Sequence, residues 1–110
     1  MAEPLWTLGE MRKATRGESP APASLGIDGI SIDSRSLKPD EAFIALRGPN
    51  RDGHAFVASA VEQGAALAIV DRNFPPSPHE EKLLRVEDTM GALNDLGRES
   101  RARATKTKII

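Results

Sequence analysis

The 110-residue sequence contains no cysteine, which excludes disulfide bonds and zinc sites built from thiolates. Tyrosine is also absent, and the aromatic residues are limited to one tryptophan and three phenylalanines. So few rings argue against a platform on which the bases of single-stranded nucleic acid stack. The net charge of −1 supplies no field that would attract nucleic acid or a membrane surface. We therefore expect neither kind of partner.

Three further absences limit location and chemistry. No apolar run approaches the length that spans a bilayer, and no basic start precedes an apolar N-terminal segment, so a cytoplasmic location is expected. The phosphate loop G-x-x-x-x-G-K-[ST] is missing, so we expect no ATP site, no other cofactor and no catalytic residue in this chain. His54 and His79 match no metal-ligand spacing, and no metal site is predicted.

The residues that are present have the proportions of a small soluble domain. Hydrophobic residues make up 39% of the chain and charged residues 28%. The length fits one domain, which we assign to residues 1–110. Predicted strands alternate with predicted helices along it. This order indicates an α/β fold, a small mixed sheet with helices packed against it.

The first half of the chain carries signals for one helix and two strands. Thr7 and Glu10 have the spacing of a capping box, which predicts a helix that starts there and stops at Gly17. Residues 29–33 alternate between apolar and polar side chains, as a half-buried strand does. The apolar run 42–46 is too short for a buried helix and predicts a buried strand.

A helix and a strand are predicted next. Residues 54–63 have helical spacing, with Phe56 on the apolar face that we expect to turn inward. Gly64 stands where a helix of this length is expected to end. Residues 67–70 form another short apolar run, which predicts a second buried strand.

The last third of the chain begins with an irregular segment. Three prolines exclude regular structure over residues 73–79, and residues 83–86 predict a short strand. The longest helix is predicted over residues 88–104, with Met90, Leu93 and Leu96 or Gly97 facing inward. A further strand is expected to begin near Lys106.

Two polar junctions follow the first two predicted strands of the sheet. The first is Asp33-Ser34-Arg35, and the second runs from Arg47 to His54. In open α/β sheets, ligands bind outside such strand ends. Arginine forms paired, charge-assisted bonds with phosphate, and glycines and a helix start bring backbone amides close to an anion. These residue types suit a phosphorylated ligand.

An ordinary structural interpretation applies to the same residues. An Asp-Ser-Arg sequence after a strand is usually a turn with a solvated arginine, and Gly48 and Gly53 are residues that any turn uses. His54 stands near a helix start, where a surface or capping role is more common than general-base catalysis. No serine, histidine and acid are placed in a way that suggests a catalytic triad.

An ordered series of short motifs resembles the N-terminal domain of the Mur ligases. The motifs lie within residues 29–72, and their combination is specific although each alone is not. They are ISIDSRSLKP (30–39), AFIALRG (42–48), DGHAF (52–56) and GAA (64–66). The flanking residues 5–7 and 86–96 are most similar to the member that adds D-Ala-D-Ala, ahead of the member that adds the third peptide residue.

The resemblance implies a domain that holds the UDP end of UDP-MurNAc-tripeptide. It also implies that ATP and magnesium are used by a central domain, with a third domain beyond it, and we expect both domains to be absent from this chain. By position in the motifs, Asp33 braces a turn. The residues implied to bind substrate are Ser34, Arg35, Arg47, Gly48, Arg51, Asp52, Gly53 and His54.

The sequence departs from the family pattern at Asp40, where glycine usually follows the proline. A type II turn needs a positive φ at that place, and a residue other than glycine disfavours it. We therefore expect a type I turn here, with a small shift of Ser34 and Arg35.

Two other classes of function remain open. One is a stand-alone regulatory or interaction domain of related fold, such as the N-terminal module of a sensor kinase. The other is a small hydrolase that uses His54. An alanine substitution at His54 that leaves any hydrolysis intact would exclude a hydrolase that uses His54.

Overall fold

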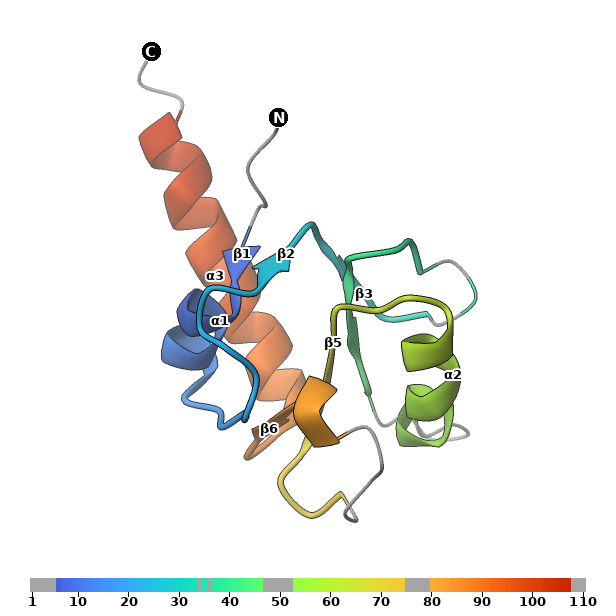
Figure 1. The fold of residues 1–110 in the computed structure, drawn as a ribbon. Helices are drawn as coiled ribbons and strands as arrows, with labels where there is room; N and C mark the ends of the chain where they lie inside the picture. The colour runs from blue at the N-terminus through green and yellow to red at the C-terminus, as the bar shows by residue number, and fades with distance from the viewer. Residues whose placement is uncertain (1–5, 34, 36, 47–52, 75–79, 108–110) are drawn as a thin grey trace.

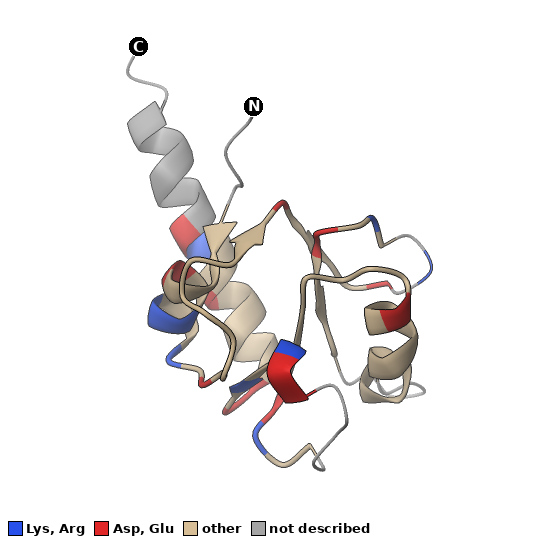
Figure 2. Cartoon of the chain, viewed as in Figure 1, with Lys and Arg blue, Asp and Glu red and all other residues tan. Residues whose placement is uncertain are grey.

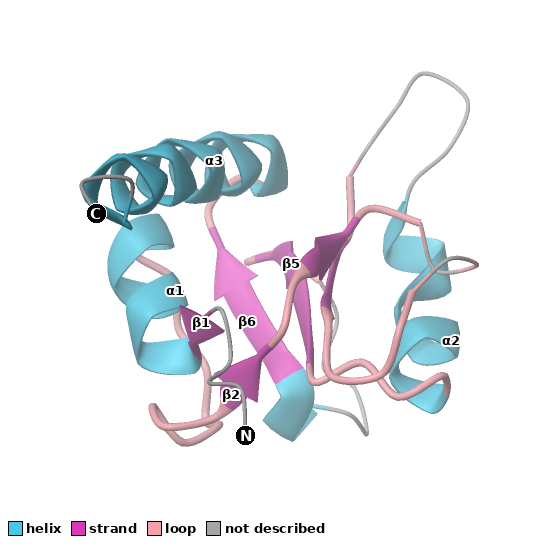
Figure 3. Cartoon of the chain, turned by 90° about the horizontal axis from the view of Figure 1, so that it is seen from above, coloured by secondary structure: helices cyan, strands magenta, loops and turns pink. Residues whose placement is uncertain are grey.

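A computed structural model describes residues 6–33, 35, 37–46, 53–74 and 80–107, without the side chains of residues 100–107. Helices α1 and α3 cover one face of a sheet, and α2 covers the other (Figures 1 and 3). The elements in chain order are β1 (Trp6–Thr7), α1 (Leu8–Thr15), β2 (Gly26–Ile27), β3 (Ile30–Ser31), β4 (Ala42–Ile44), the 3-10 helix η1 (Gly53–Phe56), α2 (Val57–Glu62), β5 (Leu67–Asp71), the 3-10 helix η2 (Glu80–Lys82), β6 (Leu83–Val86) and α3 (Thr89–Thr107).

The main sheet has four parallel strands in the order β3-β4-β5-β6. Both of its faces are covered, which is why β4 and β5 are continuous apolar runs. Successive side chains of β5 enter different cores: Leu67 and Ile69 pack with α1 and α3, while Ala68 and Val70 pack with α2. The predicted α/β class is confirmed, and strands are present within 42–46, 67–70 and 83–86, the first of them ending at Ile44. Antiparallel pairing occurs in a separate sheet of β1 and β2 and in an isolated bridge between Glu18 and Arg85 of β6.

The capping box at the start of α1 is present as predicted. The Thr7 amide donates to Glu10 Oε1 at 2.9 Å, and the Glu10 amide donates to Thr7 Oγ1 at 3.3 Å. The predicted stop at Gly17 is wrong by one residue, because Arg16 takes the left-handed conformation with φ of 59°. A Cβ on Gly17 would lie 2.8 Å from Leu84 Cδ1, so the glycine is needed for close packing on the sheet.

The buried face of α3 agrees with the prediction at Leu93 and Leu96 and differs from it at Met90. Met90 is 47% exposed, while Thr89, Ala92 and Leu96, three and four residues apart, turn inward. The helix also continues through Thr107, so the strand expected near Lys106 is not formed there. Among the helices of the described residues, none is long and apolar enough to cross a bilayer.

The type I turn expected at Asp40 is also wrong. Asp40 has a φ of 70°, which is the positive value that a type II turn requires at its third residue. The Glu41 amide closes the turn on the Lys38 carbonyl at 3.2 Å. Two further backbone hydrogen bonds hold Asp40 in place. The Asp40 amide donates to the Gly64 carbonyl, and the Asp40 carbonyl accepts the Asp28 amide. These bonds fix the conformation without glycine.

Replacing Asp40 with glycine is expected to stabilise the chain by about 0.5 kcal/mol. Glycine removes the cost of a side chain in the left-handed region, which exceeds the entropy that glycine adds to the unfolded chain. Urea denaturation of both proteins measures the difference. Asp28→Gly is the matched control, because Asp28 is also exposed but has no positive φ. That variant should lose stability, and a loss of stability in Asp40→Gly would contradict the account.

Candidate functional site

A cavity of about 490 Å³ opens where β3 and β4 end, between the turn after β3 and helix α2. The carboxyl ends of parallel strands are where open α/β sheets bind ligands. Two of its apolar walls face solvent: Ile32 is 61% exposed and Phe56 is 41% exposed. The residues that line the cavity are Ile32, Asp33, Arg35, Phe43, Leu46, Gly53, Phe56, Ser59 and Gln63. Such a mixture of apolar walls and a few polar groups is typical of a small-molecule site.

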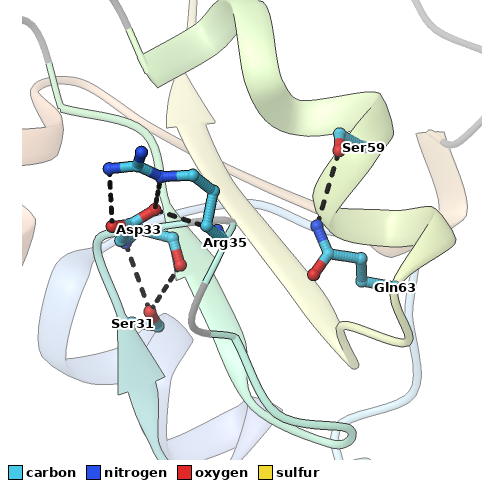
Figure 4. Close-up of polar contacts among 5 residues, drawn as sticks. All are labelled: Ser31, Asp33, Arg35, Ser59 and Gln63. Carbon is cyan, nitrogen blue, oxygen red and sulfur yellow. Dashed lines mark hydrogen bonds and ion pairs between the residues drawn. The ribbon is translucent and has the colours of Figure 1, made fainter.

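The turn after β3 places Arg35 at the rim of this cavity. The Ser31 hydroxyl donates to the Asp33 carbonyl at 3.0 Å and accepts the Asp33 amide at 3.2 Å (Figure 4). The Asp33 carboxylate accepts the Arg35 amide at 2.9 Å and lies 3.3 Å from Arg35 Nε. The Arg35 side chain is nevertheless 76% exposed, and an exposed pair of this kind is weak. Its guanidinium can therefore turn to a phosphate.

Gly53 forms the part of the wall next to β4. Its amide donates to the Leu46 carbonyl at 2.8 Å. A Cβ at this position would lie 2.9 Å from the Leu46 nitrogen and 3.1 Å from Cα of Ala45. Only glycine permits so close an approach of two backbone segments. The sequence interpretation expected this glycine to admit a ligand, whereas the space it creates here is filled by the chain itself.

Three side chains near or on α2 complete the opposite wall, and sequence reasoning did not predict any of them. Phe56 was expected to turn inward, but it lies on the cavity side. Ser59 and Gln63 project from the same side of α2, with Gln63 Nε2 3.5 Å from Ser59 Oγ (Figure 4). The spacing of these three residues, three and then four apart, places them on one helical face. For Ser59 and Gln63, which are four residues apart, that spacing is the signal by which the sequence could have revealed them.

The predicted substrate residues fall into three groups. Arg35 and Gly53 line the cavity, next to the turn that Asp33 braces. His54 lies in the same turn of 3-10 helix as Gly53, but its ring packs toward the end of β5. The remaining predicted residues lie outside the described residues, and their contacts stay predictions; they are Ser34, Arg47, Gly48, Arg51 and Asp52.

A larger cavity of about 950 Å³ lies on the other side of the sheet, between α1 and α3. Its lining combines basic residues such as Lys13 and Arg72 with acidic residues such as Glu87 and Asp95. Figure 2 shows both signs of charge on this side, whereas α2 carries one acidic residue, Glu62. The smaller cavity also contains a carboxylate, that of Asp33, so charge alone does not distinguish the two cavities. The exposed apolar side chains of Ile32 and Phe56 beside Arg35 make the smaller cavity the better candidate for a ligand that combines an apolar ring with a phosphate.

Comparison with known protein families decides the relationship. Residues 26–101 match the model described as the Mur ligase family, catalytic domain. The chain belongs to the Mur ligase family. The match covers β2 through most of α3, so it includes all four strands of the parallel sheet and the cavity beside α2.

Mur ligases of two kinds are similar to this chain. UDP-N-acetylmuramoyl-tripeptide--D-alanyl-D-alanine ligase of Bacillus subtilis is 36% identical over 83% of the chain. UDP-N-acetylmuramoyl-L-alanyl-D-glutamate--2,6-diaminopimelate ligase of Chlorobium phaeobacteroides is 49% identical over 64% of the chain. The chain spans 20% of the length of the first relative and 14% of the second.

Solved structures of Mur ligases have the same fold. Crystal structure II of MurF from Acinetobacter baumannii matches 88% of this chain with a TM-score of 0.74 and 38% identity, and the chain spans 22% of it. The MurF ligase of Thermotoga maritima in complex with ADP matches 64% of this chain with a TM-score of 0.55 and 28% identity, and the chain spans 16% of that structure. The predicted relationship to the Mur ligases is confirmed.

Proposed function

We propose that this chain binds the UDP end of UDP-MurNAc-tripeptide within an ATP-dependent ligase of peptidoglycan synthesis. The observation that carries the proposal is the cavity beside α2, with its exposed apolar walls and an exposed arginine at the rim. The Phe56 ring offers a flat apolar surface on which a uracil ring can stack, and the Ile32 side chain offers a further apolar contact. The amide of Gln63 both donates and accepts hydrogen bonds, as the edge of uracil requires. Arg35 suits the diphosphate.

The relatives favour the ligase that adds D-Ala-D-Ala. Similarity to the Bacillus subtilis enzyme extends over 83% of this chain and therefore includes more of the flanks than the 64% matched by the diaminopimelate ligase. The MurF structures from Acinetobacter baumannii match 84–88% of the chain. The higher identity to the diaminopimelate ligase over a shorter region supports the second candidate, the ligase that adds the third peptide residue.

In this proposal the chain supplies binding, and the bond-forming chemistry lies outside these residues. The sequence has no phosphate loop, and a relative from Thermotoga maritima binds ADP as a much longer chain. In the centre where that chemistry takes place, the γ-phosphoryl group of ATP, with magnesium, would pass to the tripeptide carboxylate and leave ADP. The amine of D-Ala-D-Ala would then displace phosphate from the acyl phosphate and form the amide. The role of Arg35 and its neighbours is to hold the nucleotide so that the peptide end reaches that centre.

Calorimetric titration of the chain with UDP-MurNAc-tripeptide tests the proposal. Arg35→Ala is expected to raise the Kd about tenfold, because it removes a charge-assisted contact with phosphate. The free energy of unfolding should change by less than about 1 kcal/mol, since the pair with Asp33 is exposed.

Arg98→Ala is the matched control for this titration. Arg98 is also exposed and paired, with Asp95, but it lines the larger cavity on the other side of the sheet. Its replacement should leave the Kd unchanged. Weaker binding in Arg98→Ala together with normal binding in Arg35→Ala would place the ligand in the larger cavity and contradict the proposal.

A further inference from the structure

The short helix η1 has two sides with different contacts. Gly53 and Phe56 face the candidate substrate cavity. His54 lies between them in sequence, yet its side chain is only 8% exposed and is directed away from the cavity to the end of β5. A single turn therefore forms a wall of the cavity on one side and is anchored to the sheet on the other.

The anchor is a hydrogen bond from the backbone of β5 to the imidazole ring. The Asp71 amide donates to His54 Nε2 at 3.0 Å, so this nitrogen acts as an acceptor. The Asp71 carboxylate lies 3.6 Å from the same nitrogen, and its other oxygen accepts the Thr89 amide at 3.3 Å. The contact thus joins η1 to β5 and to the first residue of α3.

The ring is also held from the side. The Phe74 ring lies 5.6 Å from the His54 ring, centroid to centroid. The Arg85 guanidinium is 5.8 Å from the Phe74 ring and donates to the Phe74 carbonyl. The guanidinium also donates two hydrogen bonds of 2.8 Å to the Glu80 carboxylate, which hold it in place and raise the pKa of Arg85 above its ordinary value. Packing and charge therefore restrict the ring to one orientation.

We propose that His54 is a positioning residue, which sets the cavity wall at Gly53 and Phe56 through its bond with the Asp71 amide and does not contact substrate. This inference rests on the proposed function and gives His54 a different role from the substrate contact that the family motif implied. The physical reason is that η1 is a single turn, held next to β4 by the bond from the Gly53 amide to the Leu46 carbonyl and to β5 by the His54 ring. Without the acceptor on His54, the bond from the Asp71 amide to η1 is lost.

Two substitutions by side chains of similar size separate the effect of the hydrogen-bond acceptor from the effect of the volume of the ring. His54→Gln keeps an oxygen near the position of Nε2, whereas His54→Leu fills the space without an acceptor. We expect His54→Leu to raise the Kd for UDP-MurNAc-tripeptide about tenfold and His54→Gln to raise it about threefold or less. Amide hydrogen exchange at Asp71 and Gly53, measured without ligand, should accelerate in His54→Leu and change little in His54→Gln.

Ile27→Val is the control for a general loss of stability, because Ile27 is fully buried in the core cluster that includes α1 and α3. It should leave the Kd and the exchange at Asp71 unchanged. Normal binding by His54→Leu overturns the inference. Equal weakening in both His54 variants with unchanged exchange at Asp71 also overturns it, since the ring would then touch the ligand.

Failure of the proposed function gives a different result. A wild-type chain that does not bind UDP-MurNAc-tripeptide contradicts the proposed function and leaves the exchange measurement to decide the inference about His54. Unchanged protection of the Asp71 and Gly53 amides in His54→Leu would then overturn it, and a loss of protection confined to η1 and the end of β5 would support it.

Discussion

An alanine in place of Gly53 is expected to destabilise the chain by about 2–3 kcal/mol and to raise the Kd for UDP-MurNAc-tripeptide more than tenfold. The added Cβ would lie 2.9 Å from the Leu46 nitrogen and 3.1 Å from the Leu46 carbonyl oxygen. Backbone atoms that are part of a strand end cannot move as a flexible side chain can. The turn must therefore shift, and with it the wall of the cavity that contains Phe56.

Gly91→Ala is the matched control for this substitution. A Cβ on Gly91 would lie 3.2 Å from Asp88 Oδ2, which is the end of a side chain that can rotate. Alanine also favours the helical conformation that Gly91 has in α3. We expect the two effects to leave stability within about 0.5 kcal/mol of wild type. Thermal and urea denaturation give the stability of both variants. Equal stabilities for Gly53→Ala and wild type would contradict the close approach of Gly53 to the backbone of Ala45 and Leu46.

The two phenylalanines of the cavity are expected to give opposite results when each is replaced by alanine. Phe43 is 1% exposed and packs with α2, so Phe43→Ala should cost about 3–5 kcal/mol of stability. Phe56 is 41% exposed, so Phe56→Ala should cost less than about 1 kcal/mol. The loss of a stacking surface should nevertheless raise the Kd about tenfold in Phe56→Ala.

Urea denaturation and calorimetric titration of the same two proteins provide the comparison. If Phe43→Ala is too unstable to titrate, Phe43→Leu retains most of the volume and should be intermediate in stability. A Phe56→Ala protein that binds as wild type would show that the exposed ring is not part of a binding surface.

The buried strands of the sheet could be predicted from the sequence because their signal is local. The runs 42–46 and 67–70 are apolar at every position, because the side chains on both faces of the sheet are covered by helices. The capping box of α1 is likewise contained within four neighbouring residues. These features depend on residue type and spacing and require no knowledge of distant contacts.

The direction of side chains at the cavity could not be predicted in this way. The segment 54–63 divides into a 3-10 turn followed by α2, and the change in residues per turn rotates Phe56 out of the apolar face. The expected strand 29–33 is limited to Ile30–Ser31 at the edge of the sheet, which leaves Ile32 exposed. Alternation of apolar residues predicted an inward side chain there, because it takes no account of where pairing ends.

Long-range packing also decides which residues take the left-handed conformation. Gly17 is the better residue for that conformation, but a residue without a side chain is needed at position 17, because the chain there passes close to Leu84 and Val86. Arg16 takes the conformation in its place. Asp40 does the same because backbone bonds from two other segments fix the turn. Neither outcome is contained in the local sequence.

Amide NMR shifts during a titration with UDP-MurNAc-tripeptide test the central claim most directly. The account predicts that the shifts concentrate on residues around the cavity beside α2, with Arg35, Gly53, Ser59 and Gln63 among them. It predicts small changes at α1 and α3, around Lys13 and Asp95. Silence at the cavity with millimolar ligand, or shifts confined to the larger cavity between α1 and α3, would contradict the account.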